Sequence, residues 1–282
     1  MSNYYYLVAG LPELSPDDNK LARTIADFRM ELYPFLTTED KRLVDLFYLQ
    51  YDNANVLKRL RDKDALIDER GNYTSDELTD ALFCLKDGDA ANTYRRWPEY
   101  LKTFIREYHQ TGTDTPVYLL ENRLAAGYYV YGRQCRNEFV AAWFAFNEDL
   151  NNVLTALTAR KYKLSLSEYV VGEGAIAEVL RTSQARDFGI LNEVDRFEEL
   201  LKISESEPME RERRIDLLRW RWLEEHTVFK YFSVERLFVF LLQTSILERW
   251  TALDKQTGGE KFREILNDLK REVQVPAEFR KQ

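Results

Sequence analysis

The stretch that decides the fold is Pro116–Tyr162, PVYLLENRLAAGYYVYGRQCRNEFVAAWFAFNEDLNNVLTALTARKY. After its first residue it contains no proline, and apolar side chains recur at helical spacing from Leu120 to Leu157. This pattern predicts either one very long helix or two helices that are broken near Gly127 or Gly132.

The rest of the chain also consists of helical segments separated by short turns. Only 11 glycines and 7 prolines occur in 282 residues, so helix breakers are scarce. Ser15-Pro16 and Ser233 are expected to begin helices, and Thr74 with Glu77 has the spacing of a capping box, as does Ser165 with Glu168. The expected helices cover approximately residues 16–33, 38–50, 53–60, 74–88, 97–112, 116–162, 165–168, 175–181, 190–203, 208–222, 233–250 and, after Gly258-Gly259, 262–269. No stretch alternates with a period of two, so we predict an all-α protein with little or no sheet.

Composition narrows the classes of partner. The formal net charge is −8, so nucleic acid or a lipid surface as main partner would require a local basic patch. Cys84 and Cys135 have no CxxC companion, which argues against a disulfide framework or a zinc site and fits a reducing cytoplasm. The N-terminus lacks the features of a signal peptide, and the longest apolar runs fall far short of the roughly 18 residues that a membrane helix needs. We therefore expect a cytoplasmic protein without direct membrane insertion.

Residues that would carry catalysis are few. His109 and His226 both fall at expected helix ends, where a cationic side chain favours the helix dipole. The segment Val171–Ala177, VGEGAIA, superficially matches a dinucleotide fingerprint, with Glu193 near the distance of the ribose-binding acid. That fingerprint works only between a buried strand and a helix, so we favour a loop between helices. We predict no catalytic, cofactor-binding or metal-binding residue, no small-molecule substrate, and a protein that is not an enzyme.

Two features could instead serve a protein partner. The densest basic and aromatic stretch in this acidic chain consists of Arg211, Arg213, Arg214, Arg219, Trp220 and Arg221. Arginine and tryptophan are enriched in interface hot spots, but a solvated helix face with ordinary i,i+4 pairs is the commoner explanation. Tyr4 and Tyr5 belong to a terminal tyrosine cluster, which suits either a half-exposed contact surface or a chain end that is pinned onto the core.

Three stretches together resemble one family. Phe146–Leu164, FNEDLNNVLTALTARKYKL, is similar to the (D/N)LxN-x-LxxxLRA(K/R) helix of the C-type central-stalk protein of V/A-type ATPases, whose counterpart in eukaryotic vacuolar enzymes is the d-type protein. Phe229–Leu242, FKYFSVERLFVFLL, resembles the F-G-x-E-x-x-x-x-Y-L-L segment of that family, with Ser233 where glycine is usual. Tyr4–Ala9 is similar to its tyrosine-rich opening, although Gly10-Leu-Pro12 breaks the chain where the family continues into a helix. The match is closer to an uncharacterised bacterial family that accompanies V/A-type ATPase components.

The resemblance implies a funnel-like assembly of about three similar V-shaped helical lobes within a single all-α unit of residues 1–282. The approximate lobes are 1–112, 113–205 and 206–282, and they could be interleaved. A shift of 96 positions sets Phe144 and Leu150 against Phe240 and Ile246, which is a weak internal repeat that could also arise by chance.

A function follows from the resemblance as an expectation. The protein would be a non-catalytic adaptor that caps the membrane rotor ring and couples it to the central shaft of a V/A-type rotary ATPase or ATP synthase during proton or other ion transport. Its partners would be the proteolipid subunits of the rotor ring and the central-shaft subunits, and it would lie at the cytoplasmic face, peripheral to the inner membrane. The alternatives are a free α-helical scaffold that binds another cytoplasmic protein and an enzyme whose residues meet only in the fold.

Overall fold

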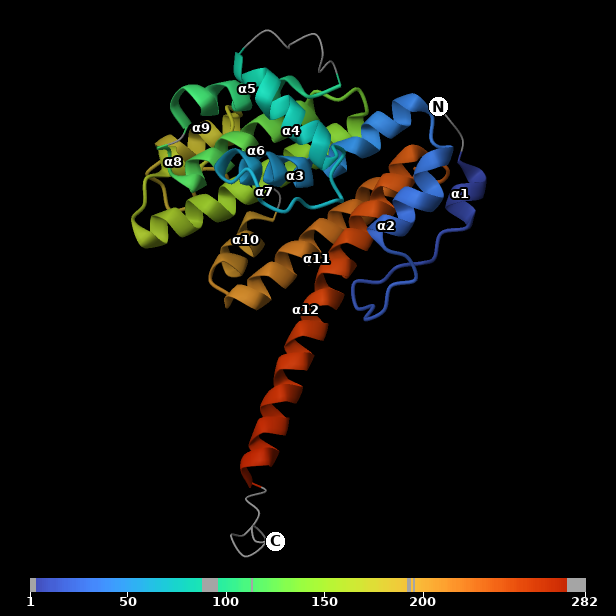
Figure 1. Cartoon of the computed structure of the whole chain (residues 1–282). Coiled ribbons are helices and arrows are strands. Elements are labelled where there is room, and N and C mark those ends of the chain that lie inside the picture. The colour runs from blue at the N-terminus through green and yellow to red at the C-terminus, as the bar shows by residue number, and fades with distance from the viewer. Residues whose placement is uncertain (1–3, 88–95, 113, 192–193, 195, 273–282) are drawn as a thin grey trace, which may run out of the picture. The chain divides into compact units, whose positions relative to one another are not determined.

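The computed structural model describes residues 4–87, 96–112, 114–191, 194 and 196–272, and every regular element in this part of the chain is a helix (Figure 1). The prediction of an all-α fold is therefore confirmed. The α-helices are α1 (Tyr5–Ala9), α2 (Ile25–Asp27), α3 (Thr38–Arg61), α4 (Ser75–Cys84), α5 (Glu99–Glu107), α6 (Val117–Arg133), α7 (Glu138–Tyr162), α8 (Leu166–Tyr169), α9 (Ala175–Thr182), α10 (Phe197–Ser204), α11 (Pro208–Thr227) and α12 (Val234–Glu272). Short π- or 3₁₀-helical segments are η1 (Phe28–Leu32), η2 (Tyr33–Phe35), η3 (Leu85–Asp87) and η4 (Tyr108–Gly112).

The stretch Pro116–Tyr162 forms two helices, α6 and α7, and not one very long helix. Helix α6 ends at Arg133, directly after Gly132, and Asn137 caps α7 by accepting the Val140 N–H at 3.1 Å. The two helices pack against each other, and Gly132 makes this possible because an added Cβ would lie only 2.2 Å from the Phe144 ring. The glycine therefore serves close packing as well as marking the break.

Several helix boundaries differ from the prediction. The expected helix over 16–33 begins at Ile25, because Thr24 and Asp27 form the capping box, whereas the Ser15 N–H donates to the Asp18 carboxylate in a turn. The segment expected as helix from Ile190 begins only at Phe197, after Arg196 in the left-handed conformation. A local side-chain bond at Thr24 and a left-handed backbone at Arg196 thus set helix starts that apolar spacing alone would place earlier.

Two expected breaks are absent. Helix α3 is continuous through Asn53, whose side chain accepts a hydrogen bond from the Tyr100 hydroxyl at 2.7 Å instead of capping a new helix. Helix α12 likewise continues through Gly258-Gly259. Glycine in a helix interior costs only about 1 kcal/mol, so without a competing cap it does not end the helix.

Predicted caps had mixed outcomes. Thr74 and Glu77 form the expected reciprocal capping box of α4, and α11 begins at Pro208 as expected. Ser165 precedes α8 but its hydroxyl pairs with that of Ser167 at 2.8 Å. The Ser233 hydroxyl is buried and has no hydrogen-bond partner among the described residues. Neither serine therefore provides the side-chain cap that the sequence suggested.

The chain divides into two compact units. The first consists of residues 4–35 together with 231–272, and the second of residues 36–230. The unit boundaries do not coincide with the lobe boundaries expected near residues 112 and 205, and the three-lobe division stays a prediction. In the second unit, α7, α9, α10 and α11 enclose an apolar core that includes Val153, Leu180, Phe188 and Leu218.

An internal repeat is visible within the second unit. Helices α3, α4 and α5 begin at residues 38, 75 and 99, and helices α7, α9 and α10 begin at 138, 175 and 197. The successive offsets are 100, 100 and 98 residues, so one long and two shorter helices recur at nearly constant spacing, and the second copy has the additional four-residue helix α8 between α7 and α9.

Candidate functional site

The loop between α8 and α9 is clamped to α7 by one asparagine. The buried Asn152 side chain donates to the Val171 carbonyl at 2.8 Å and accepts the Val171 N–H at 2.9 Å. Arg181 adds a bond to the Val170 carbonyl at 2.8 Å. Because a buried loop must have its polar backbone groups satisfied, these side chains fix its path into α9.

The loop that follows α3 is held in the same way. The buried Asn55 side chain donates to the Asp68 carbonyl and accepts the Asp68 N–H, both at 2.8 Å. Asp52, which is fully buried, accepts the Asn72 N–H at 2.8 Å. The two asparagines therefore play matching parts in the two copies of the repeat.

A glycine lies over a buried carboxylate in both loops. An added Cβ would lie 2.4 Å from Asp52 at Gly71 and 2.0 Å from Glu148 at Gly172. Gly172 also has φ +79°, which favours glycine. It lies in the loop between α8 and α9, so the dinucleotide-like segment is the interhelical loop that we favoured, while Glu193 lies outside the described residues.

The first unit contains a related contact. Glu248 on α12 accepts the Ile25 N–H at 3.1 Å, at the start of α2. Each of the long helices α3, α7 and α12 thus holds the backbone that leads into a short helix. Sequence reasoning missed these clamps, although Asn-Val-Leu occurs at both 55–57 and 152–154 and is the signal that could have revealed two of them.

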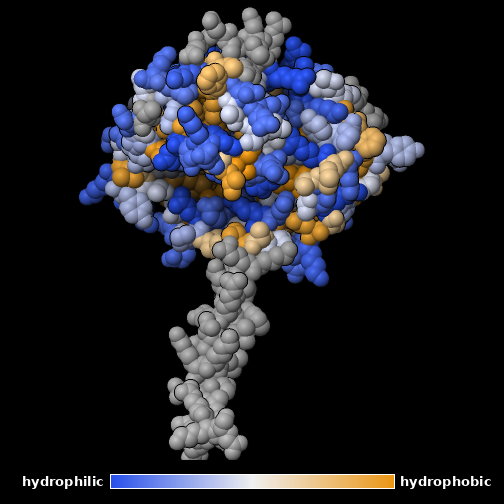
Figure 2. All heavy atoms as spheres, in the orientation of Figure 1, coloured by the Kyte–Doolittle hydropathy of each residue, from blue (hydrophilic) through white to orange (hydrophobic). Residues whose placement is uncertain are grey.

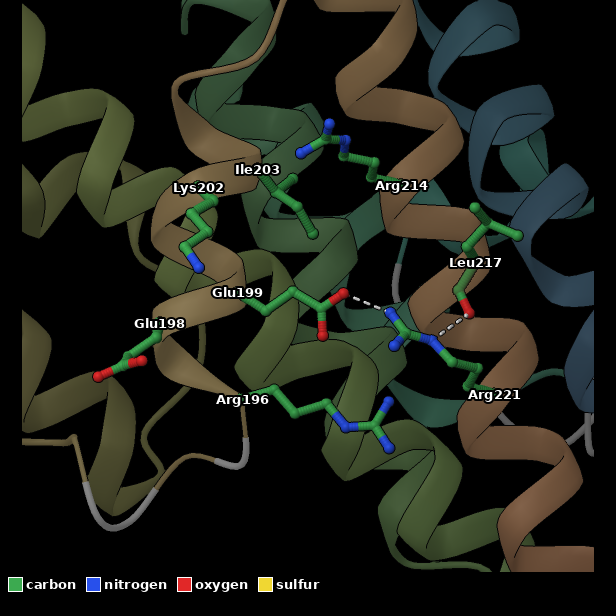
Figure 3. Close-up of a pocket in the computed structure, with 8 residues that line it drawn as sticks. All are labelled: Arg196, Glu198, Glu199, Lys202, Ile203, Arg214, Leu217 and Arg221. Atoms are coloured by element: carbon green, nitrogen blue, oxygen red, sulfur yellow. Dashed lines mark hydrogen bonds and ion pairs between the residues drawn. The ribbon is translucent and has the colours of Figure 1, made fainter.

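Two of the predicted partner-binding arginines line a groove between α10 and α11 (Figure 3). The groove has a volume of about 560 Å³, and Ile203 and Leu217 contribute apolar surface to it. Its charged lining residues are Arg196, Glu198, Glu199, Lys202, Arg214 and Arg221. Four cations and two carboxylates therefore line the groove, and three of the cations pair with carboxylates: Arg221 with Glu199, Arg214 with Glu210, and Arg196 with Glu225.

The ion pairs around this groove are exposed. Arg221 pairs with Glu199 across the groove, as Figure 3 shows, and Arg214 pairs with Glu210 of its own helix at 2.7 Å. Such exposed pairs contribute between about 0 and 1 kcal/mol each, so a partner carboxylate can compete for the same guanidinium groups. Arg196 and Lys202, which the sequence did not single out, come from α10 and the residue before it.

Other predicted partner-binding residues have intramolecular roles. Arg219 donates to Asn147 at 2.9 Å and Asn151 at 3.2 Å, both on α7. Trp220 is buried and donates to Glu224 at 2.8 Å. Arg211 donates to Thr158 at 3.1 Å, whereas Arg213 is exposed. The basic cluster of α11 is therefore divided, with Arg213, Arg214 and Arg221 on the exposed side.

The terminal tyrosines are also divided. Tyr4 is buried and its N–H donates to the Phe232 carbonyl at 2.8 Å, as expected for a chain end that is pinned down. The Tyr5 ring lies 4.7 Å from the Phe232 ring and is about half exposed, and Tyr6 is almost fully exposed. Only the second and third tyrosines could contact a partner.

The histidines lie at helical ends, as the sequence predicted. His109 is in η4, and His226 is next to the last residue of α11 with Nδ1 2.9 Å from the Trp222 carbonyl oxygen. Among the described residues, no cluster of three or more His, Cys, Asp or Glu side chains is placed to hold a metal ion. In the same part of the chain, no helix is long and apolar enough to cross a membrane, and hydrophilic residues are interspersed with small apolar areas on the face in Figure 2.

Comparison with known proteins gives one match. Neither the curated proteins nor the solved structures searched contain a match to this chain. A family model described as "Protein of unknown function (DUF2764)" matches residues 1–273, which is nearly the whole chain. The chain therefore belongs to this DUF2764 family.

Proposed function

We propose that this protein is a non-catalytic adaptor of a V/A-type rotary ATPase, which caps the membrane rotor ring and couples it to the central shaft. The observation that carries the proposal is the repeated helical module, in which Asn55 and Asn152 clamp corresponding loops to α3 and α7. Its support from the sequence is the resemblance of Phe146–Leu164 and Phe229–Leu242 to the C-type central-stalk protein of these ATPases.

The mechanical demands of such a part agree with the construction of the second unit. A coupling between ring and shaft must transmit torque without bending, and close-packed interiors resist deformation. The clamps tie each loop to its long helix through buried hydrogen bonds, so the loops are stiffened together with the helices. Residues of the α10–α11 groove would contact a protein partner, and the protein would lie at the cytoplasmic face of the membrane through that contact.

Affinity purification of the intact complex tests the proposal. The tagged full-length chain is expressed in its native cell, and membranes are solubilised under gentle detergent. We expect the tag to recover both the rotor-ring proteolipid and the central-shaft subunits. Recovery of neither under conditions that keep the rest of the ATPase together would refute the proposal, and recovery of a different protein in their place would favour a free scaffold.

Charge reversal in the groove locates the contact. The double variant Arg214→Glu/Arg221→Glu should lower recovery of the ATPase subunits at least tenfold, because it turns two cations of the groove into acids. Arg123→Glu is the matched control, since Arg123 is an exposed arginine on α6 outside the groove. Equal recovery with both variants, each with native circular dichroism, would show that the groove is not the contact surface.

A further inference from the structure

A second, smaller cavity lies among α7, α10 and α11 in the second unit. It has a volume of about 280 Å³, and its apolar walls include Phe146, Leu150, Leu218 and Trp222. Its charged and titratable lining residues are Asp149, Arg196, Glu225 and His226. An apolar cavity with a few converging polar groups is the usual form of a site for a small ligand.

The carboxyl group of Asp149 distinguishes this cavity. It makes no hydrogen bond or ion pair with any of the residues that the structure describes, whereas the adjacent Glu148 pairs with Arg133 at 2.6 Å. Burial, together with the charge of Glu148, raises the pKa of Asp149 to about 6, and Arg133 only partly opposes this. A carboxylate therefore lines the cavity at neutral pH without a cation of its own.

The other charged groups of the cavity are already engaged. Arg196 pairs with Glu225, with 2.5 Å between Nη2 and Oε1. The His226 ring stacks on Trp222 with centroids 4.0 Å apart, and its Nδ1 lies against the Trp222 carbonyl. Phe146 also stacks with Trp222, with centroids 5.2 Å apart. The lining therefore offers an acceptor with negative charge, an aromatic cluster and aliphatic walls.

We propose that this cavity binds an aliphatic amine, whose ammonium group bonds the Asp149 carboxylate and whose hydrocarbon chain lies against Leu150, Leu218 and Trp222. A carboxylate can only accept hydrogen bonds, so its complement is a donor with positive charge. Neighbouring aromatic rings attract the same charge, and a methylene chain matches the apolar walls. The ammonium group belongs either to a free diamine or to a lysine side chain of a protein. This binding is separate from the proposed coupling function and does not depend on it.

Isothermal titration calorimetry of the full-length chain tests the site. The probes are cadaverine as a free diamine, Nα-acetyl-lysine amide as a lysine side chain, and 1-pentanol as a neutral chain of similar length. We expect at least one amine to bind with a dissociation constant of about 0.1–1 mM, the range open to ligands of this size, and pentanol not to bind. Tighter binding of cadaverine indicates a free amine, and tighter binding of the lysine probe indicates a protein side chain. No binding of either amine, or equal binding of pentanol, would overturn the proposal.

Variants assign the binding to the carboxylate. Asp149→Asn should weaken amine binding at least tenfold, because it removes the charge and keeps the shape. Glu121→Gln is the control, since Glu121 is an exposed carboxylate on α6 that lines neither this cavity nor the α10–α11 groove, and it should leave the affinity unchanged. Equal weakening by both variants would indicate a nonspecific charge effect and overturn the proposal.

Proton release gives an independent signature. An ammonium group lowers the pKa of the carboxyl that it contacts, so binding at about pH 5.5 should release a proton. The number of protons released is obtained by repeating the calorimetric titration in buffers with different heats of ionisation. His226 also lines the cavity, and histidine commonly exchanges protons near neutral pH, so the release is measured in His226→Gln as well. Glu148 and Arg133, which act on the Asp149 carboxyl, and Arg196 and Glu225, which line the cavity, are unchanged in sequence in all variants. Release should persist in His226→Gln and vanish in Asp149→Asn, and the opposite pattern would refute the role of Asp149.

Discussion

Replacing Asp149 by asparagine should stabilise the protein at neutral pH, which is unusual for the removal of a charge. The folded-state pKa of this carboxyl is raised to about 6 from an ordinary value of 3.8, chiefly by burial. Between these two pH values the folded state binds more protons than the unfolded state, so the free energy of unfolding falls as pH rises. This loss of stability is complete at pH values above the folded-state pKa, and it is absent at pH values below the pKa of the unfolded state.

The expected gain in the free energy of unfolding follows from the difference between the folded-state and unfolded-state pKa of Asp149. A pKa difference of one corresponds to about 1.4 kcal/mol, so the full shift would correspond to about 3 kcal/mol. The side chain is partly exposed, and solvent screening reduces the expected gain to about 1–2 kcal/mol. Asparagine has nearly the same shape and no charge, so Asp149→Asn should recover this amount where the carboxylate is ionised.

Urea unfolding followed by circular dichroism provides the assay. The variant should exceed the wild type in free energy of unfolding by about 1–2 kcal/mol at about pH 7.5, and the two should converge at about pH 4. Glu121→Gln, at an exposed position on α6, serves as the control, with no comparable change. A variant that is less stable than the wild type at neutral pH, or a gain that does not depend on pH, would refute the reasoning.

The remaining predictions concern the clamps and the arginines, and urea unfolding measures all of them. Asn152→Ala should lower the free energy of unfolding by about 2–3 kcal/mol, because it leaves two backbone groups of the loop unpaired, and a loss below about 1 kcal/mol would contradict the clamp. Gly172→Ala should cost more than Gly189→Ala, since both have positive φ but only at Gly172 would the new Cβ displace a side chain, the Glu148 carboxylate that pairs with Arg133. Equal costs would mean that backbone conformation alone matters. Arg219→Ala should lower the free energy of unfolding by about 2–3 kcal/mol, because it removes two hydrogen bonds to α7. Arg214→Ala should change it by less than about 0.5 kcal/mol, because its ion pair is exposed. Similar values for the two variants would contradict the division of the basic cluster into a buried and an exposed side.

Local sequence signals predicted the helices where no tertiary contact competed with them. Thr74 and Glu77 cap α4 because both partners of the capping box lie within four residues of each other. Asn53 failed as a break because its side chain bonds Tyr100, which is 47 residues away. The weak repeat seen as a shift of 96 positions pairs residues of α7 with residues of α12 and stays a prediction. The repeat in the second unit instead pairs α3 with α7, and Asn55 and Asn152, which mark it, were not recognised in the sequence.

Candidate site residues were harder to predict than helices. Arg214, Arg219 and Arg221 are the same residue type on one helix, yet Arg219 points to α7 while the other two line the groove. Which arginine turns inward depends on the rotation of α11 against α7, and this rotation results from packing between segments about 70 residues apart. The sequence did not single out Asp149 either, because the cavity that it lines forms only when residues of α11 pack beside α7.

By itself the sequence determined that the chain is helical, where most of its helices begin, and that its net charge is negative. Helix periodicity and capping depend on residues that are close together in the chain, and net charge depends only on composition. Only the tertiary structure decided which helices run on without a break, which polar side chains clamp the loops, and which charges line the groove and the cavity. Those features arise from contacts between residues far apart in the chain, and the direction of a side chain is settled by what packs against its helix.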